Sequence, residues 1–215
     1  MDHASHHNQL TKRGQRQNNA GQAPLCRSRT RRDGPLFLVD TDPQGSLTAW
    51  QTRRESETPQ RVDLPFEGLD RGLALLRRHG ASYCIVDTAS GRVEIAKELF
   101  KLADLVIFPV QASEDDLTAA QVTVQALKEA GKPFMFVLTR VKANTLITAQ
   151  ATAMLSRHGQ VAETFMGDRT VYKSPYPKGQ TITEAEPRGV AAKEISALWA
   201  SVESCLHETI EIRRG

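Results

Sequence analysis

Four short apolar runs mark the chain from residue 35 onward. They span residues 36–39, 83–86, 105–108 and 134–138, and each ends in a polar residue or a proline. Runs of this length that are apolar on both faces are typical of buried parallel strands. Helical patterns lie between and after them, at about 68–79, 92–103, 114–130, 144–158 and 188–212. The alternation predicts an α/β fold: a doubly wound, mostly parallel sheet with helices on both faces.

The first 34 residues have a different composition. They show no apolar periodicity and are rich in Gln, Asn, Arg and His, so we predict a disordered segment at 1–34 and a folded domain at 35–215. This segment carries a charge of +5, whereas the rest of the chain sums to −2. A basic arm for nucleic acid is one interpretation. Its histidines, His3, His6 and His7, are more typical of a tail than of a metal site.

Length and cysteine usage restrict the class of protein. A chain of 215 residues is long enough for one domain with a core, and no run approaches 18 apolar residues. We expect neither a membrane span nor a signal peptide. The three cysteines, Cys26, Cys84 and Cys205, show no paired spacing. A reducing cytoplasm is therefore the predicted location, without a disulfide framework or a zinc site.

Polar side chains follow three of the predicted strands. Asp40 and Asp42 follow the first, Asp87 ends the second, and Thr139 with Arg140 follows the fourth. Ligands of open parallel sheets bind at the carboxyl ends of the strands. Carboxylates there suit magnesium, held directly or through water, and the positioning of an attacking water. The alternative is that each Asp simply begins a turn.

The sequence around these residues resembles that of a known family. Residues 39–50 read V-D-T-D-P-Q-G-S-L-T-A-W, residues 85–89 read I-V-D-T-A, and residues 103–113 read A-D-L-V-I-F-P-V-Q-A-S. In this order they resemble the D-x-D-P-Q segment, the Walker B strand and the A-D-L-V-I-I-P-V segment of ParA-type partition ATPases. These are P-loop NTPase-like proteins of the ParA/MinD superfamily with a deviant Walker motif. The likeness covers about residues 35–207 and is strongest to the small plasmid type.

The resemblance implies roles for individual residues. Asp40 would polarise the attacking water, Asp42 would lie in a switch-like loop, and Asp87 would orient the magnesium shell. Arg140 would lie against the adenine. Thr139 and Pro109 are the other nucleotide-binding positions that the resemblance implies. The implied cofactors are ATP and Mg²⁺.

The resemblance also implies partners. An ATP-bound homodimer would bind DNA non-specifically, with Arg188 and Lys193 near the last helix as candidate contacts. A ParB-type centromere-binding protein would stimulate hydrolysis, and the protein would be associated with the nucleoid. We expect no membrane attachment, because residues 208–214 are short and mixed in charge.

One family motif is missing. The family opens with a strand and a loop of the form K-G-G-x-G-K-T-T, whose amides and second Lys hold the phosphates and whose Thr binds magnesium. The only early Gly–Lys grouping here, residues 11–19, is not such a loop. We therefore expect impaired ATP binding, exposed ladder edges on the neighbours of the lost strand, and poor solubility or dependence on a partner.

The genetic code permits an explanation. If the codons for residues 12–19 are read one base later, they permit the sequence K-G-G-S-G-K-T-T. The shifted Lys falls 23 positions before Asp40, which is about where the family keeps it. Our hypothesis is that residues from about 7 to 30 are an out-of-frame translation of a phosphate loop. The alternative is a real basic tail on a degenerate paralogue.

Two other functions are open. The first is a non-catalytic protein that binds DNA or a partner through the basic arm. The second is another deviant-Walker enzyme, such as a cobyrinate amidase or an iron-protein reductase. The lack of a Cys pair for a cluster and of a glutaminase-like domain argues against both of these enzymes.

Overall fold

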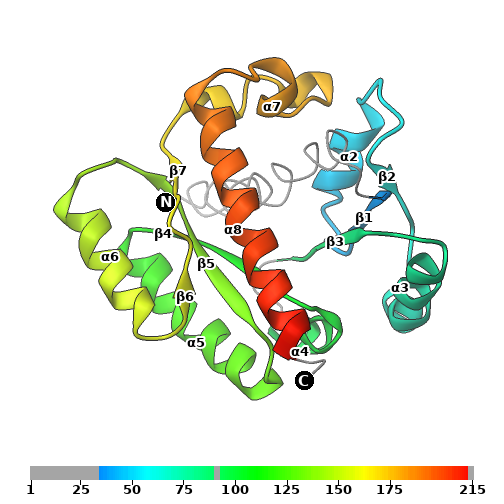
Figure 1. The fold of residues 1–215 in the computed structure, drawn as a ribbon, viewed down its shortest axis with the longest axis horizontal. Coiled ribbons are helices and arrows are strands. Elements are labelled where there is room, and N and C mark those ends of the chain that lie inside the picture. Colours follow the sequence, from blue (N-terminus) through cyan, green and yellow to red (C-terminus); the bar gives the residue numbers. More distant parts are fainter. Residues whose placement is uncertain (1–33, 90–92, 213–215) are drawn as a thin grey trace, which may run out of the picture. The chain divides into compact units, whose positions relative to one another are not determined.

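The computed structural model describes residues 34–89 and 93–212. These residues form two compact units, each with its own parallel sheet (Figure 1). The first unit contains residues 34–89 and 171–187, and the second contains residues 93–170 and 188–212. The predictions made for residues 1–33, among them Cys26, the three histidines and the shifted reading frame, lie outside the described residues.

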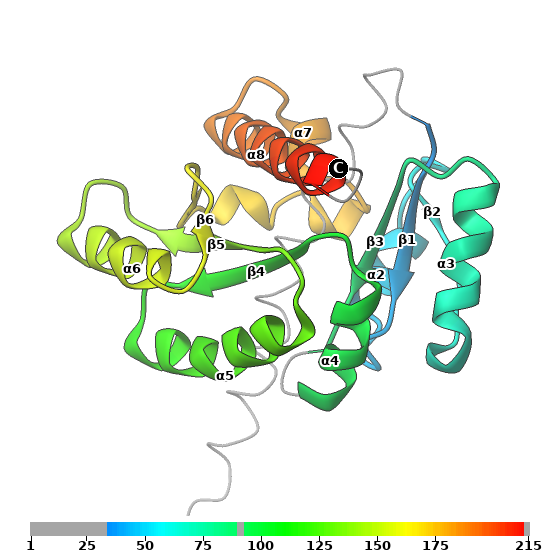
Figure 2. The same ribbon diagram turned by 60° about the horizontal axis from the view of Figure 1, so that its bottom comes forward.

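The sheet of the first unit has the strand order β2-β1-β3. Strand β1 (Leu36–Asp40) pairs in parallel with β2 (Gln60–Arg61) on one side and with β3 (Tyr83–Asp87) on the other. Helix α2 (Ser46–Thr52) connects β1 to β2, and helix α3 (Leu69–Arg78), preceded by the 3₁₀ turn Phe66–Gly68, connects β2 to β3. The two connections run in opposite directions along the sheet. Because such crossovers are right-handed, α2 and α3 lie on opposite faces (Figure 2).

The remaining part of the first unit is the segment 171–187. It contains most of the 3₁₀ turn Thr170–Tyr172, a second 3₁₀ turn at Tyr176–Lys178 and the short helix α7 (Ile182–Ala185). The core of this unit is small. It consists of Leu36, Leu38, Leu47 and Trp50, with three half-buried residues packed against it: Tyr83, Ile85 and Tyr176.

The sheet of the second unit is built on β5. Strand β5 (Phe134–Val141) lies between β4 (Val106–Gln111) and two short strands, β6 (Gln160–Val161) and β7 (Met166–Gly167), all of them parallel to β5. Helices α5 (Glu114–Ala130) and α6 (Leu146–Ser156) connect successive strands in the same direction, so both lie on one face. Helix α8 (Val190–Ile212) lies on the other face, and α4 (Val93–Leu102) precedes β4 (Figure 2).

Local sequence signals account for the helix ends. Ser113 caps α5 by accepting a hydrogen bond from the amide of Asp116, and Gly131 ends it with a φ of 63°. Thr145 caps α6 in the same way, through the amide of Thr148. The core of this unit joins α5 and α6 to the sheet through Val124, Phe136, Leu138, Ala151, Leu155 and their neighbours.

The predicted α/β class with parallel sheets is confirmed, and so are all four predicted strands and five predicted helices. In the described part of the chain, five helices and strands were not predicted: α2, the two-residue strands β2, β6 and β7, and α7. Among the described residues, β3 and β4 each pair with a strand on one side only. Both are half-buried along most of their length, although their sequences are apolar on both faces.

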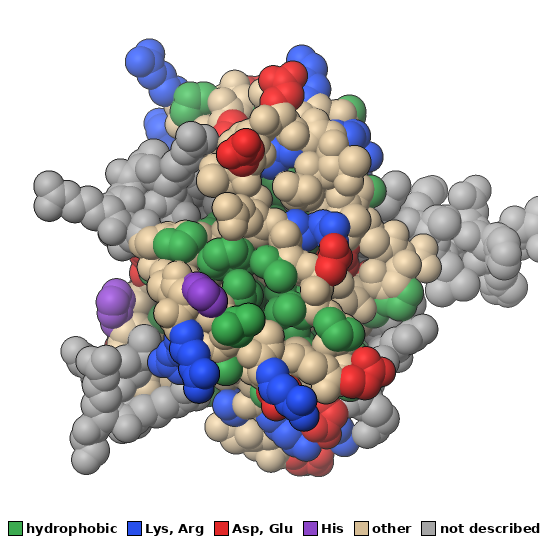
Figure 3. Space-filling view, turned by 90° about the vertical axis from the view of Figure 1, so that its right-hand side faces the viewer, with side chains coloured by type: hydrophobic (Ala, Val, Ile, Leu, Met, Phe, Trp, Pro, Cys, Tyr) green, Lys and Arg blue, Asp and Glu red, His purple; other side chains and the backbone are tan. Residues whose placement is uncertain are grey.

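No helix in the described part of the chain is long and apolar enough to cross a membrane. The two described cysteines, Cys84 and Cys205, are free thiols. Several large apolar side chains are exposed, among them Phe66 and Leu75 in the first unit. Figure 3 shows hydrophobic side chains at the surface beside Lys, Arg, Asp and Glu side chains.

Candidate functional site

The carboxyl ends of β1 and β3 bring two predicted site residues together. Asp40 and Asp87 are register partners at the end of the ladder between the two strands. The strands are joined there by Thr41, whose amide and hydroxyl both donate to the backbone carbonyl of Asp87, at 2.9 and 2.7 Å. The predicted meeting of these carboxylates at one sheet edge is therefore found in the structure.

The side chain of Asp40 is held by its own loop and by α2. Its Oδ2 accepts hydrogen bonds from the amide and the hydroxyl of Thr48, both at 2.8 Å, and its Oδ1 accepts one from the amide of Asp42 at 3.1 Å. The amide of Thr48 belongs to the first turn of α2, where helix donors lack a backbone partner. Asp40 thus caps α2 from outside the helix and is locked in one orientation.

Asp42 lies in the turn that follows β1. Its carboxylate accepts a hydrogen bond from the amide of Gln44, and its carbonyl accepts one from Gly45, at 2.9 and 2.8 Å. Gly45 has a φ of 60°, which glycine adopts without strain and which turns the chain into α2. The D-x-D-P-Q-G sequence therefore encodes a tight turn that connects the strand to the helix.

The electrostatics of Asp87 differ from those of an ordinary surface aspartate. Burial, and after it the charges of Asp40 and Asp42, raises the pKa of Asp87 to about 7. Three carboxylates share this edge, and none of them forms an ion pair with Lys, Arg or His within residues 34–89 and 93–212. A cation placed here would favour the ionised form of Asp87.

The remaining predicted positions lie in the second unit. Thr139 is buried near the end of β5 and donates a hydrogen bond to the carbonyl of Val110. Arg140 follows with a φ of 55°, where the pairing of β5 with β7 shifts register. Such a bulge re-aims a side chain, and here the guanidinium of Arg140 lies 3.8 Å from Asp168. Pro109 lies in β4 and is half-buried.

The candidate DNA contacts are exposed. Arg188 precedes α8, and Lys193 lies in its first turn. Neither has an ion pair among those found in the described residues. Their exposure is compatible with contact to a phosphate backbone, and it is equally the ordinary environment of surface cations.

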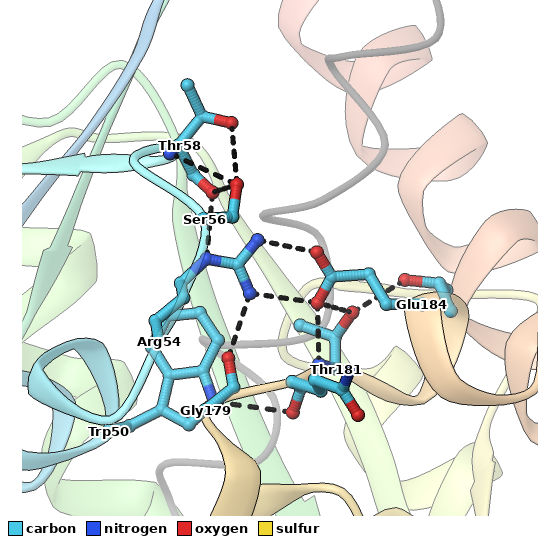
Figure 4. Close-up of polar contacts among 9 residues, drawn as sticks. Trp50, Arg54, Ser56, Thr58, Gly179, Thr181 and Glu184 are labelled. Carbon is cyan, nitrogen blue, oxygen red and sulfur yellow. Dashed lines mark hydrogen bonds and ion pairs between the residues drawn. The ribbon is translucent and has the colours of Figure 1, made fainter.

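Sequence reasoning missed a polar cluster that anchors α2 (Figure 4). Arg54, just after α2, has a side chain only 3% exposed. Its guanidinium donates to both carboxylate oxygens of Glu184 and to the carbonyls of Thr58 and Gly179. It also lies over the Trp50 ring, 5.1 Å from its centroid. A single basic residue after a short helix has no pattern that would have predicted this.

Two further contacts tie the same helix to the segment 171–187. The indole of Trp50 donates to the carbonyl of Gln180, and the hydroxyl of Tyr176 donates to the carbonyl of Ser46. Gly179 has a φ of 64°, and a Cβ there would lie 2.5 Å from the backbone nitrogen of Arg54. The loop between Asp40 and α2 is therefore held from both ends.

The described residues fit one half of a magnesium–nucleotide site. Mg²⁺ is usually held by one or two carboxylates together with water and phosphate oxygens, which Asp40 and Asp87 could supply in part. No three His, Cys, Asp or Glu side chains within the described ranges converge enough to hold a metal alone. The other half is a glycine-rich loop with a Lys for the phosphates, and no such loop stands in the sequence.

Comparison with known proteins supports the resemblance. No family model matches the chain. A curated relative is "Maintenance of carboxysome distribution protein A" from Halothiobacillus neapolitanus, 26% identical over 175 residues, which cover 77% of this chain and 81% of the relative.

Solved structures share the fold at low identity. The apo McdA structure from "Cyanthece" has a TM-score of 0.69 at 14% identity, over 86% of this chain and 94% of that one. The septum site-determining protein MinD with Mg-ADP from Pyrococcus horikoshii has 0.66 at 13%, over 89% and 90%. A putative plasmid partition protein bound to AMPPNP from Borrelia burgdorferi has 0.65 at 13%, over 85% and 92%. The chain has the fold of the ParA/MinD ATPases, and its predicted resemblance to them is confirmed.

Proposed function

We propose that this chain is the body of a ParA/MinD-type ATPase that partitions or positions a cargo on DNA. The observation that supports this most is the pair of register partners Asp40 and Asp87 at the carboxyl end of a parallel sheet within this fold. In the proposed site Asp40 orients the attacking water, Asp42 belongs to the switch loop, and Asp87 orients the magnesium shell. Thr139, Arg140 and Pro109, in the second unit, keep in this proposal the nucleotide-binding roles that the family resemblance implies.

The cargo and partners are part of the same proposal. A homodimer binds DNA non-specifically through Arg188 and Lys193, and a ParB-type protein stimulates it, in the nucleoid region of the cytoplasm. The cargo is a plasmid, as in the Borrelia protein's description, or a protein body, as in the carboxysome relative's. Replacing Arg188 and Lys193 with Ala should weaken DNA binding and its salt dependence. Lys178→Ala, in the 3₁₀ turn at Tyr176–Lys178, is the control.

We further propose that ATP binding is impaired in the chain as written, because residues from about 7 to 30 are translated out of frame. The gene's nucleotide sequence decides this directly. Codons 12–19, read one base later, should spell K-G-G-S-G-K-T-T and be followed by codons for a helix. Any other reading at these eight codons rejects the frame proposal but leaves the proposed roles of Asp40 and Asp87 untouched.

Nucleotide titration tests the impaired ATP binding and the proposed role of Asp40 separately. The chain as written should bind magnesium–ATP too weakly to saturate in the micromolar range, because the phosphates lack amide and Lys contacts. A chain with residues 7–30 translated in the shifted frame should bind and hydrolyse ATP. In that chain Asp40→Ala should abolish hydrolysis and retain binding, whereas Asp63→Ala, an exposed carboxylate, should change neither. Micromolar binding by the chain as written contradicts the impairment.

A second candidate function is a non-catalytic paralogue that binds DNA or a partner. The observation in its favour is the charge of +5 in residues 1–34 against −2 in the rest. It predicts salt-dependent DNA binding without ATP that is lost on deletion of residues 1–34. Binding that requires ATP and the shifted frame would instead favour the ATPase.

A further inference from the structure

Helix α2 has little stability of its own. It has seven residues, none of them charged, and Gly45 at its N-cap position has no side chain to accept a hydrogen bond from the first turn. Isolated helices shorter than about 12 residues are marginal in water. A Ser, Thr, Asp or Asn cap is the usual acceptor for the first amides. The position of α2 is therefore set by contacts with other parts of the first unit.

The direction of the Asp40 carboxylate depends on that position. Within the described residues, its Oδ2 accepts hydrogen bonds from the amide and the hydroxyl of Thr48 in α2. Its Oδ1 accepts one from the amide of Asp42 in its own loop. Hydrogen bonds weaken steeply away from their preferred angle. A displacement of α2 would move Thr48, and the carboxylate of Asp40 would lose its fixed direction.

Arg54 fixes the far end of α2. Its amide donates to the carbonyl of Gln51 at 3.0 Å, so it continues the backbone of the helix. Its guanidinium donates to the carbonyls of Thr58 and Gly179, at 2.8 and 2.9 Å, and to both carboxylate oxygens of Glu184. A guanidinium is planar and presents its donors in fixed directions. Partners on two different chain segments therefore define where Arg54, and with it the end of α2, lies.

Glu184 is itself held by the start of α7. Its Oε2 accepts hydrogen bonds from the amide and the hydroxyl of Thr181, at 2.9 and 3.2 Å, in a capping box. Figure 4 shows these contacts in order, from Trp50 through Arg54 and Glu184 to Thr181. The carboxylate that receives Arg54 is thus a fixed acceptor, and the segment 171–187 holds α2 through it.

We propose that Arg54 is a positioning residue for the carboxylate of Asp40. Arg54 and Glu184 hold α2 in place, and α2 holds Thr48 against Asp40, which keeps the carboxylate in one orientation at the end of β1. This inference rests on the function proposed above, in which Asp40 orients the attacking water. An attacking water has to be held in one geometry, and a carboxylate that changes rotamer does not hold it.

The rotamer of Asp40 tests the positioning directly. Three-bond NMR couplings between the backbone and Cγ of Asp40 distinguish one χ1 rotamer from an average of several, in the folded full chain without nucleotide. The wild-type couplings should correspond to one rotamer, and those of Arg54→Ala to an average. In Arg54→Ala the amide of Thr48 should also exchange with solvent about tenfold faster, because its acceptor is no longer fixed. Couplings of a single rotamer in Arg54→Ala overturn the proposal.

A second ion pair in the same unit separates positioning from stability. Arg61 lies in β2, the strand beside β1, and pairs with the exposed Asp63. Arg61→Ala should leave the couplings of Asp40 at their wild-type values, because this pair does not involve α2. Averaged couplings in Arg61→Ala would mean that any loss of stability in the unit frees Asp40, and would overturn the proposal.

A conservative variant covers the case in which Arg54→Ala does not fold. Arg54→Lys keeps the charge but loses the planar set of donors. It should also give averaged couplings for Asp40, and couplings of a single rotamer in Arg54→Lys overturn the proposal in the same way.

The outcome is separable from that of the proposed function, because the couplings need no bound nucleotide. Averaged couplings in the Arg54 variant, together with unchanged hydrolysis in Asp40→Ala, would support the positioning and reject the catalytic role of Asp40. Couplings of a single rotamer, together with loss of hydrolysis in Asp40→Ala, would reject the positioning and support the catalytic role.

Discussion

The two units differ in how their central strands are protected. In the second unit β5 has neighbours on both sides, and Met135, Phe136 and Val137 have no solvent exposure. In the first unit β1 is similarly buried, but its neighbour β3 is only partly buried along its whole length. The first unit compensates with polar contacts, of which the buried cluster around Arg54 is the main one (Figure 4). Apolar packing dominates one unit, and polar anchoring contributes more to the other.

The largest effect should come from packing in the second unit. Phe136→Ala should lower its free energy of unfolding by about 3–5 kcal/mol, because a fully buried ring leaves a cavity. Ile85→Ala in the first unit should cost about 1–2 kcal/mol, because the side chain is only partly buried. The chain has one tryptophan in each unit, Trp50 and Trp199, so single-tryptophan variants report each transition by fluorescence. Equal losses of unfolding free energy in the two variants would contradict the proposed difference between the units.

The next largest effect concerns ion pairs, where the loss should be greater in the first unit than in the second. Arg54→Ala should destabilise the first unit by about 3 kcal/mol, because it removes the buried cation that pairs with Glu184 and donates to two carbonyls. The matched ion pair in the second unit joins Arg169, whose side chain is 41% exposed, to Glu194. Arg169→Ala should cost at most about 1 kcal/mol. Urea unfolding followed at Trp50 and Trp199 checks both, and a larger loss for Arg169→Ala would contradict the proposed anchoring.

A pair of glycines sharpens the same point. Gly179→Ala should cost about 2–3 kcal/mol, because the new Cβ meets the backbone of Arg53 and Arg54 in addition to the strain of a positive φ. Gly131, after α5, has nearly the same φ and open space around it, so Gly131→Ala should cost about 1 kcal/mol. Thermal unfolding of both variants measures the difference, and equal shifts would show that the close approach at Gly179 relaxes freely.

The smallest effect concerns the carboxylate edge. Since burial raises the pKa of Asp87 to about 7, its contribution to stability is present below pH 4 and is lost as pH rises towards 7. Asp87→Asn should remove this pH-dependent loss of stability. In the absence of a bound cation, it should stabilise the first unit at pH 8 by about 1–2 kcal/mol. The exposed Asp70→Asn is the control. A wild-type stability that does not fall between pH 4 and 8 relative to Asp87→Asn would contradict the shift.

The strands and long helices could be predicted because their signals are local. Apolar runs of four or five residues identified β1, β3, β4 and β5, and the cap residues Ser113 and Gly131 agree with the ends of α5. The meeting of Asp40 and Asp87 also followed from sequence, because the carboxyl ends of adjacent parallel strands share an edge. Short elements such as β2 and β6 escaped prediction because two residues carry no periodicity.

By itself, the sequence determined the α/β class, the strand ends with Asp40 and Asp87, and the absence of a glycine-rich loop among the printed residues. Only the tertiary structure decided that Asp40 caps α2, that Arg54 is buried against Glu184, and that β3 pairs on one side only among the described residues. The physical reason is sequence separation. Arg54 and Glu184 lie 130 positions apart, and contacts of that kind depend on how chain segments meet rather than on any local pattern.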